Sequence, residues 1–487
     1  PEPRGPLSAS LSAEGGQPGT GMARARLEAG GDRLAWRLGG SYLTSDGVSA
    51  FDRRLGGRER DGFRNLGFNA RATLRLSDAL NAEWRSIWSK SHFGFDGYPP
   101  PDYLFADTRE TGEVEELVNY VGLELRSFEG RWKNRIGYAY THTDRRDFNP
   151  DSSVAETFNA MGRNRRLEWQ STLSLSSRYQ AILGLESERS DFRTAAPSEF
   201  DPAPVPLRAD TRIDSAYAEL QATPVSPLAL TLGVRHDDHA TFGGHTSPRA
   251  ALAWTLSSAT WLRASFGDGF KSPTLYQLYS PYGNLALRPE EARGWDVGLE
   301  HKLGGDRVDL MLTWFHRNTH NMIDFVSCFG ATDPRCAAQP FGFYDNVQRT
   351  SAHGVEFGAA VRAGDRSRLT LNYTRTDARN DTQGSPNFGH ELARRARDTA
   401  YLGLSRDWGG GLSTAVAAQF VGRTFDDAAN LTTLGSYTLL DLRASYAWSA
   451  RTSLYARLEN ALDKQYETTG GYGSMGRAFA AGIRTSF

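Results

Sequence analysis

The most constraining feature of the sequence is a strict alternation of apolar and polar residues in which charged side chains occupy the polar face. In residues 437–448, one face carries Leu440, Leu442, Ala444, Tyr446 and Trp448, and the other carries Asp441, Arg443 and Ser445. Alternation with a period of two predicts β-strands whose two faces meet different surroundings. Charges on an inward face are costly in a dry core but not in a water-filled lumen. The pattern therefore favours a β-barrel with a wet interior over a soluble sandwich.

The composition agrees with this prediction. The 487 residues include 50 Gly, 25 Phe, 19 Tyr and 11 Trp. This abundance suits a barrel with lipid-facing alternate residues, although it also suits a large secreted β-protein. No run of about 18 apolar residues occurs, so no transmembrane helix is expected. The formal net charge of -1 gives no argument for binding to nucleic acid.

The connections between alternating segments have two sizes, and the sizes themselves alternate along the chain. Ten are short turns, and between them lie eleven longer stretches that are polar or rich in Pro and Gly. This arrangement predicts an all-β fold, a transmembrane antiparallel β-barrel of about 22 strands with short periplasmic turns, long extracellular loops and both chain ends on the periplasmic side. We expect one barrel domain over residues 1–487. The longest expected loops are 93–114, 146–160, 192–209, 269–290, 319–347 and 378–394.

The chain ends in a segment that has the length of a membrane-crossing strand. Residues Phe479 to Phe487 alternate over 9 positions with aromatics at both ends. A tilted strand needs about this length to cross the hydrocarbon of a bilayer, and aromatic girdles mark the two interfaces. A half-buried strand of a soluble sandwich is the alternative for this segment taken alone.

The two cysteines, Cys328 and Cys336, lie close together in a segment that contains Gly and Pro. Such a pair predicts a small disulfide and an oxidising compartment, with two unpaired thiols as the alternative. A zinc site is not favoured, because no clustered histidines complete the ligand set.

Two stretches resemble the TonB-dependent outer-membrane receptors. Residues 266–300 contain the aromatic-Gly-x-Gly-Phe-Lys-x-Pro and Leu-x-Pro-Glu patterns, and residues 460–487 are similar to the end of these receptors. The resemblance implies a location in the outer membrane of a Gram-negative bacterium, contact with its lipid, and a monomer that works with the TonB complex. Phe487 resembles the terminal aromatic that the barrel-assembly machinery reads. Family members begin with a TonB-contacting segment and a plug domain. Because the first strand is expected near residues 6–14, the chain is expected to be the barrel portion without the plug.

Within this family the pattern is most similar to the cobalamin receptors, in stretches such as 60–74, 140–153 and 463–477. This resemblance implies TonB-dependent uptake of cobalamin or a related corrinoid bound by extracellular loops. A ferric siderophore or haem as the ligand, a plugless passive pore and a soluble secreted protein are the alternatives. Tyrosine offers a flat amphipathic ligand both apolar area and a hydroxyl. The candidate ligand-binding residues are Phe95, Tyr98, Tyr103, Tyr276, Tyr279, Tyr282, Asn284 and Tyr472.

The resemblance also implies that calcium orders the extracellular loops, although no cofactor is required. Calcium takes six or more oxygen ligands, several of them from carboxylates. The candidate ligands are Asp147, Asp151, Asp201 and Asp210, and a solvated salt-bridged loop is the alternative because Arg145 and Arg146 lie beside them. We find no paired nucleophile and base in the sequence, so no enzymatic activity is expected.

Overall fold

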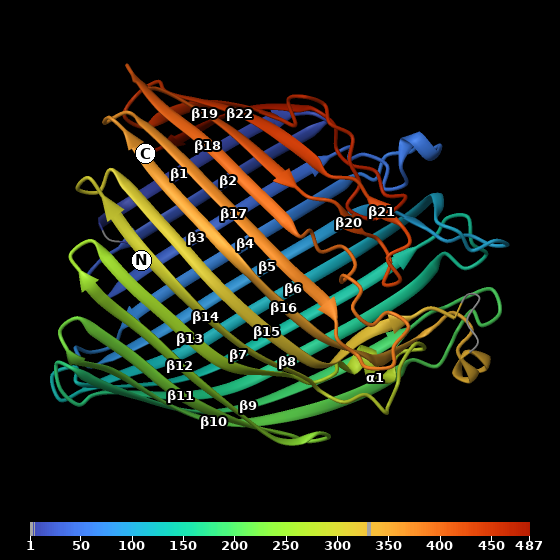
Figure 1. The fold of residues 1–487 in the computed structure, drawn as a ribbon, viewed down its shortest axis with the longest axis horizontal. Helices are drawn as coiled ribbons and strands as arrows, with labels where there is room; N and C mark the ends of the chain where they lie inside the picture. Colours follow the sequence, from blue (N-terminus) through green and yellow to red (C-terminus); the bar gives the residue numbers. More distant parts are fainter. Residues whose placement is uncertain (1–2, 4, 329–332) are drawn as a thin grey trace.

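The computed structural model describes residues 3, 5–328 and 333–487, in which 22 antiparallel strands form one closed sheet. The strands run tilted and side by side around the barrel (Figure 1), and each pairs with its neighbour in the sequence. The barrel of about 22 strands predicted from the alternation is thereby confirmed. Pro1 and residues 329–332 of the expected loop 319–347 lie outside the described residues.

The strands of the barrel follow one another in chain order. The first eleven are β1 (Gly5–Gly16), β2 (Thr20–Gly30), β3 (Leu34–Ser45), β4 (Phe63–Arg75), β5 (Leu80–Gly97), β6 (Ala106–Ser127), β7 (Trp132–Phe148), β8 (Glu156–Ser174), β9 (Tyr179–Ala195), β10 (Leu207–Val225) and β11 (Leu228–His239). The others are β12 (Gly243–Ser257), β13 (Thr260–Lys271), β14 (Glu290–Leu303), β15 (Val308–Val326), β16 (Phe343–Ala363), β17 (Ser367–Asn380), β18 (Asp398–Gly409), β19 (Leu412–Val421), β22 (Tyr437–Ala447), β23 (Thr452–Glu459) and β24 (Ala478–Ser486).

The remaining elements are small and lie in the loops. They are η1 (Arg53–Leu55), α1 (Leu275–Tyr279), η2 (Pro334–Ala337) and the hairpin of β20 (Thr424–Phe425) and β21 (Thr433–Leu434). In Figure 1, α1, β20 and β21 lie at the right, and both chain ends lie at the opposite end of the barrel. No helix of the described residues is long and apolar enough to cross a bilayer.

The barrel closes where the first strand meets the last. β1 and β24 pair antiparallel from Ser10 opposite Ser486 to Gly16 opposite Ala480. Beyond this ladder, the Phe487 N–H donates to the Ala9 carbonyl at 2.8 Å, and the Ala9 N–H donates back at 3.2 Å. A Cβ on Gly16 would lie 2.7 Å from the Ala480 Cβ, so glycine permits this close approach. The terminal residue thus takes part in closing the sheet.

An ion pair also crosses this seam. Glu14 of β1, which is only 7% exposed, accepts a hydrogen bond from Arg457 of β23 at 2.9 Å. Both side chains lie on the lumen face, and β24 runs between their two strands. A charge-assisted bidentate contact of this kind is directional, so it favours one register of the three strands.

The two faces of the sheet have the predicted chemistry. On β17 and its neighbours, Leu371 lies between Ala359 and Leu402, whereas the adjacent Thr370 lies between Ala360 and Gly403. The outward face presents large exposed apolar residues such as Leu402 and Leu404. The lumen face carries ion pairs, including Arg71–Glu83 at 2.9 Å. An apolar outside and a polar inside characterise a barrel in a bilayer.

The strands extend further than the sequence indicated, so several loops are shorter than expected. The expected loop 93–114 shrinks to residues 98–105, because β5 and β6 remain paired up to Gly97 opposite Ala106. β6 has 22 residues, twice the number that a tilted strand needs to cross the hydrocarbon. Backbone hydrogen bonds between strands continue beyond the lipid-facing part of the barrel. There the apolar and polar residues no longer alternate, so the sequence pattern does not indicate a strand.

The cysteine pair lies at one edge of the loop end. Cys328 and Cys336 form a disulfide with a Cα–Cα distance of 5.4 Å. Beside it, Arg335 donates to Asp345 at 2.8 Å and lies 4.3 Å from the centre of the Phe343 ring. The disulfide, the ion pair and the ring together attach this loop to the start of β16.

A pair of adjacent substitutions tests the assignment of the two faces. We expect Leu371→Arg to lower the free energy of unfolding in lipid vesicles by about 2–4 kcal/mol, because it places a charge on the apolar outward face between Ala359 and Leu402. Thr370→Arg, the matched control on the lumen face, is expected to cost less than about 1 kcal/mol. Equilibrium unfolding by denaturant measures both, and equal costs would contradict the assignment.

Candidate functional site at the loop end of the barrel

Three groups of side chains gather in the loops at one end of the barrel. Figure 1 shows that these loops lie at the end opposite the chain ends. The acidic cluster consists of Glu59, Asp61, Asp96 and Asp107. The seam aromatics are Phe51, Tyr98, Phe105 and Tyr472. The α1 aromatics are Phe158, Phe192, Tyr276, Tyr282, Phe325 and Tyr344.

The acidic cluster is assembled from three separate segments. Glu59 and Asp61 lie in the loop between β3 and β4, whereas Asp96 and Asp107 lie at the facing ends of β5 and β6. Carboxylate oxygens of Glu59, Asp96 and Asp107 all lie within 4.8 Å of one another. The pairing of β5 with β6 places two carboxylates side by side, and the preceding loop adds the others.

The same carboxylates hold the loop 46–62 in place. Asp96 accepts hydrogen bonds from the N–H groups of Phe51 and Thr108, and Asp107 accepts from the N–H of Arg58 at 2.8 Å. Asp61 accepts from the N–H of Ala50. These contacts fix the loop over the ends of β5 and β6, so the positions of the carboxylates do not depend on long flexible side chains.

The cluster has an excess of negative charge. Among the described residues, no ion pair joins any of its four acids to Lys, Arg or His. Glu59 Oε1 and Asp61 Oδ1 are buried with no N–H group donating to them, and the two side chains share a hydrogen bond when Glu59 is protonated. Burial and then the neighbouring Asp61 raise the pKa of Glu59 to about 7, and burial raises the pKa of Asp61. Three carboxylates within 4.8 Å of one another, with no cation paired to them among the described residues, fit a hard divalent cation such as Ca2+.

The seam aromatics join the loops 46–62, 98–105 and 460–477. The Phe105 and Tyr472 rings stack with centroids 4.2 Å apart, and Phe51 and Tyr98 each lie 5.5 Å from Phe105. A β-bridge pairs Phe51 with Tyr472. Burial raises the pKa of Tyr472 to about 12. The loop that carries the acidic cluster is therefore packed against the loop 460–477.

The α1 aromatics form because the segment 272–289 folds over the barrel mouth. α1 leaves β13 and contacts β10, which lies three strands away in the sheet. Tyr276 thereby reaches Phe158 and Phe192, at 6.3 and 6.0 Å between ring centres, and lies 6.2 Å from Tyr344. Burial raises the pKa of Tyr276 to about 12, so its hydroxyl remains neutral and able to donate.

Thr274 and Asn284 fix this segment from its two ends. The Thr274 side chain accepts from the Gln277 N–H at 3.1 Å, and the Gln277 side chain accepts from the Thr274 N–H, which forms a capping box. Asn284 Nδ2 donates to the Tyr344 carbonyl at 2.9 Å. Asn284, a candidate ligand-binding residue from the sequence, thus attaches the segment to β16.

The other candidate ligand-binding residues divide between the two sides of the mouth. Tyr282 lies 5.7 Å from Phe325, and Tyr103 lies 5.8 Å from Phe341, measured between ring centres. Phe95 contacts Phe93 on the lumen face of β5. Tyr279 ends α1 and takes part in none of the ring pairs found among the described residues. Of the candidates, the structure places Tyr98 and Tyr472 among the seam aromatics and Tyr276 and Tyr282 among the α1 aromatics, whereas Phe95, Tyr103 and Tyr279 belong to neither group.

The acids expected to bind calcium are not gathered. Asp147 pairs with Arg145 at 2.9 Å, and Asp151 pairs with Arg109. Asp201 is exposed in the loop 196–206. Asp210 of β10 lies opposite Asp191 of β9. Within the described chain, the group that could hold an ion contains none of these four. Arg145, two residues before Asp147, and Arg109 of β6, 42 residues before Asp151, neutralise these two acids, and calcium binding by any of the four stays a prediction.

The sequence analysis did not find the acidic cluster, because its first and last members, Glu59 and Asp107, are 48 residues apart. A usable signal exists in the stretch 95–107, FDGYPPPDYLFAD, where two aspartates flank a Pro-rich turn. A hairpin across that turn would make Asp96 and Asp107 neighbours. The contribution of Glu59 depends on how the preceding loop folds, which the sequence pattern does not show.

Comparisons with known proteins agree with the geometry. The family description "TonB dependent receptor-like, beta-barrel" matches residues 35–461. The chain is 25% identical to the vitamin B12 transporter BtuB of Photobacterium profundum, over 96% of this chain and 74% of that protein. It is 28% identical to BtuB of Vibrio cholerae, over 53% of this chain and 40% of that protein. The crystal structure of the siderophore receptor PirA from Acinetobacter baumannii superposes with a TM-score of 0.80 at 18% identity, over 100% of this chain and 81% of that one, and shows the fold.

The raised pKa of Glu59 makes the loop 46–62 sensitive to pH. At a pH between 4.5, the ordinary pKa of a glutamate, and about 7, Glu59 is protonated when the loop is closed and ionised when the loop is open. Lowering the pH from 8 to 6 in the presence of a chelator should therefore stabilise the closed loop. The increase in amide protection should be at most about tenfold, because the cluster is partly exposed. Hydrogen exchange, corrected for the intrinsic pH effect, measures this change.

Glu59→Gln serves as the control for this experiment. It keeps the shape of the side chain and removes the titrating group, so the protection of the loop should no longer depend on pH. A pH dependence that persists in Glu59→Gln would assign the effect to another group.

Proposed function

Because the chain belongs to the family of TonB-dependent receptors of the outer membrane of Gram-negative bacteria, we propose that it forms the barrel through which cobalamin or a related corrinoid is taken up. The curated relatives that support this ligand are both vitamin B12 transporters, and one of them aligns with nearly the whole chain. Proteins of this family are receptors and transporters and not enzymes. Uptake would depend on the TonB complex, as the name of the family states.

The observation that carries the proposal is the combination of aromatic groups and an acidic cluster at the mouth. A corrinoid is broad, flat and edged with amides, so its recognition needs ring surfaces with polar edges. The α1 aromatics supply three tyrosines, Tyr276, Tyr282 and Tyr344, on one side. The seam aromatics supply Tyr98 and Tyr472 on another. Neutral hydroxyls and apolar faces suit an uncharged amphipathic ligand.

We further propose that Ca2+ binds at Glu59, Asp61, Asp96 and Asp107. The ion would supply the positive charge that the cluster lacks, and carboxylate oxygens are its preferred ligands. Bound calcium would hold the loop 46–62 against β5 and β6. Because the Asp52 N–H donates to the Gly471 carbonyl at 2.9 Å, the order would extend to the loop 460–477. Loops ordered in advance lose less entropy when the ligand binds.

A ferric siderophore is the second candidate ligand. The observation in its favour is that the fold superposes on a siderophore receptor. Ferric siderophores are often anionic, and the α1 aromatics lie beside Arg145, whose guanidinium carbon is 5.9 Å from both Phe93 and Phe158. Asp147 compensates this arginine at 2.9 Å, so the side chains at this place offer little net positive charge.

Titration of the chain in detergent micelles with cyanocobalamin tests the ligand. We expect calorimetry to give micromolar or tighter binding in Ca2+ and binding at least tenfold weaker in a chelator, which corresponds to about 1.4 kcal/mol. A ferric catecholate siderophore should not compete. Competition by the siderophore, or binding of the siderophore alone, would assign the chain to the second candidate.

Asp61→Asn tests the calcium site separately. The amide oxygen can still accept from the Ala50 N–H, so the loop keeps its hydrogen bond while the site loses a charge. We expect calcium to lose its effect on cyanocobalamin affinity, or to need at least tenfold higher concentration. Asp151→Asn is the matched control, because Asp151 is an exposed loop acid outside the cluster. An equal loss in both variants would contradict the assignment.

Tyr276→Ala and Tyr276→Phe test the α1 aromatics. The phenylalanine variant keeps the three ring contacts, and the alanine variant removes them. We expect a loss of tenfold or more in cyanocobalamin affinity for alanine and less than threefold for phenylalanine, since ring area contributes more than one hydroxyl. Unchanged affinity in Tyr276→Ala would remove these rings from the site.

A further inference from the structure

The outward face of the wall carries a surface rich in arginine where β8, β9 and β10 approach the loop end. These strands are neighbours in the sheet (Figure 1). Arg165 of β8 is directly opposite Arg189 of β9, which in turn is directly opposite Arg212 of β10. Four residues beyond Arg189, Arg193 is opposite Arg208 in the same way. The group, called the outer arginines below, consists of Arg163, Arg165, Arg189, Arg193, Arg208 and Arg212.

The alternation of side chains places the outer arginines on the lipid side of the wall. Leu167 of β8, two residues from Arg165, is exposed on the outward face. Leu185 of β9, four residues from Arg189, is exposed on the same face. The side chains between them point the other way, and Phe192 is one of the α1 aromatics inside the lumen. The outer arginines therefore begin where the apolar band of the outward face ends.

This surface has more positive than negative charge. Arg165 pairs with Asp191 at 3.2 Å, and Arg212 pairs with Asp214 at 2.9 Å. Among the described residues, no ion pair joins the other four outer arginines to a carboxylate. The third aspartate on this face of the three strands is Asp210, which is opposite Asp191. Six arginines thus lie among three aspartates.

Other arginines of the outward face are compensated, which sets this group apart. On β7, next to β8, Arg146 pairs with Asp144 at 3.3 Å, and on β17 Arg375 pairs with Asp398 at 3.2 Å. On β11, next to β10, Asp238 bounds the surface. Like charges directly opposite each other on neighbouring strands destabilise a sheet, and the outer arginines form three such pairs. An anion bound between them would remove this repulsion.

We propose that the outer arginines bind a lipid headgroup with two phosphate groups, in the leaflet at the loop end of the barrel. The planar guanidinium group of arginine binds phosphate with two parallel hydrogen bonds. Neighbouring strands are about 4.8 Å apart, so the row of Arg165, Arg189 and Arg212 can contact one phosphate group together. The row of Arg193 and Arg208 lies about 13 Å further along the strands, so it needs a second phosphate group.

The position of the surface favours a lipid over a free anion. The apolar band of the outward face contacts acyl chains in a bilayer, and the headgroups of those lipids lie at its edge. The chains of one lipid would lie against Leu167 and Leu185 while its phosphate groups contact the guanidinium groups. This binding takes place outside the lumen, so it does not depend on which ligand the barrel transports.

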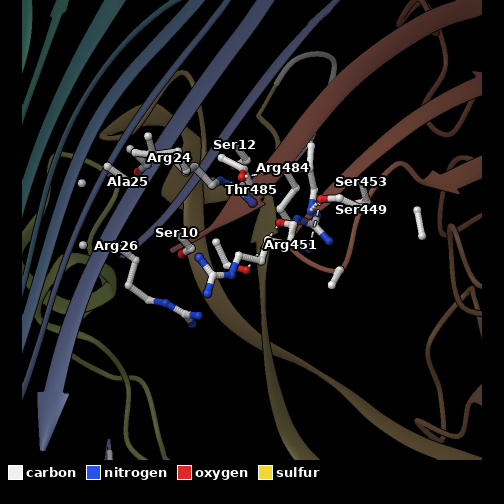
Figure 2. Close-up of a pocket in the computed structure, with 18 of the residues that line it drawn as sticks. Ser10, Ser12, Arg24, Ala25, Arg26, Ser449, Arg451, Ser453, Arg484 and Thr485 are labelled. Atoms are coloured by element: carbon white, nitrogen blue, oxygen red, sulfur yellow. Dashed lines mark hydrogen bonds between the residues drawn. The ribbon is translucent and has the colours of Figure 1, made fainter. Parts of the chain in front are cut away.

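A second group of arginines provides a control, because it faces the lumen. Figure 2 shows this group around a cavity of about 880 Å³ at the turn end, beside β1 and β24. It is called the seam arginines below and consists of Arg24, Arg26, Arg451 and Arg484. Arg24 and Arg484 are both opposite Ser12 of β1, on the lumen face. Substitution there changes the net charge of the chain without changing the surface that lipid contacts.

Native mass spectrometry of the chain in detergent micelles tests the proposal, with lipid A that carries two phosphate groups as the probe. We expect this lipid to bind, and lipid A with one phosphate group to bind about fivefold or more weakly, because one row of arginines loses its phosphate. Inorganic phosphate at about 10 mM should not displace the lipid, because acyl chains add apolar contacts. Equal binding of phosphatidylcholine, or displacement by inorganic phosphate, would overturn the proposal.

Two pairs of substitutions locate the site. Arg189→Gln with Arg212→Gln should weaken the binding of lipid A about tenfold or more, because only Arg165 of the row of three remains. Arg24→Gln with Arg484→Gln, among the seam arginines, is the matched control and should change the affinity less than about twofold. An equal loss in both pairs would show binding to net charge alone and would overturn the assignment. The migration of unheated samples in gels checks that each variant is folded.

A third pair tests the assignment of the second phosphate group. Arg193→Gln with Arg208→Gln removes the row nearer the loops and keeps the row of three. This variant should bind the two forms of lipid A with equal affinity, because the second phosphate group no longer meets an arginine. A preference for two phosphate groups that persists in this variant would overturn the two-row arrangement.

Discussion

The structure depends on closing the sheet. In hydrocarbon every backbone N–H and C=O needs a partner within the protein, so a strand with a free edge cannot persist there. β1 and β24 provide that partner for each other, from Ser10 opposite Ser486 to Gly16 opposite Ala480. The Glu14–Arg457 contact and the bonds between Ala9 and Phe487 reinforce the same line. With the cylinder closed, alternate side chains are divided between lipid and lumen, and the connections are divided between the two ends.

That division separates two kinds of surface. At the loop end, long connections pack on one another through rings and carboxylates, and loops on a rigid scaffold are where ligand recognition usually lies. At the turn end, the connections are too short to fold over the lumen. The acidic cluster and the seam arginines consequently lie at opposite ends of the barrel, on loops in one case and on strands in the other.

The acidic cluster links the position of the loop 46–62 to a negative charge that no basic side chain compensates among the described residues. Its carboxylates hold the loop 46–62 through backbone N–H groups, yet burial and then the neighbouring carboxylates raise the pKa of Glu59 to about 7. A proton or a cation relieves the repulsion between the carboxylates, and only the cation can satisfy several oxygens at once. The aromatic stack of Phe105 on Tyr472 then carries any gain in order to the last loop. The order of the mouth and the charge of the cluster are thus linked.

The sequence by itself determined the strands, their count and their two faces, because a period of two is a local property that each segment such as 437–448 displays independently. It also marked the tyrosines of the mouth and the Cys328–Cys336 pair. It did not determine which acids meet: Asp147 and Asp151 pair with arginines, while Glu59, Asp96 and Asp107 converge from separate segments. Nor did it show that Arg24 and Arg484, at opposite ends of the chain, both lie beside Ser12. Those contacts follow from register and closure, which only the tertiary structure decides, because they join residues that no local pattern relates.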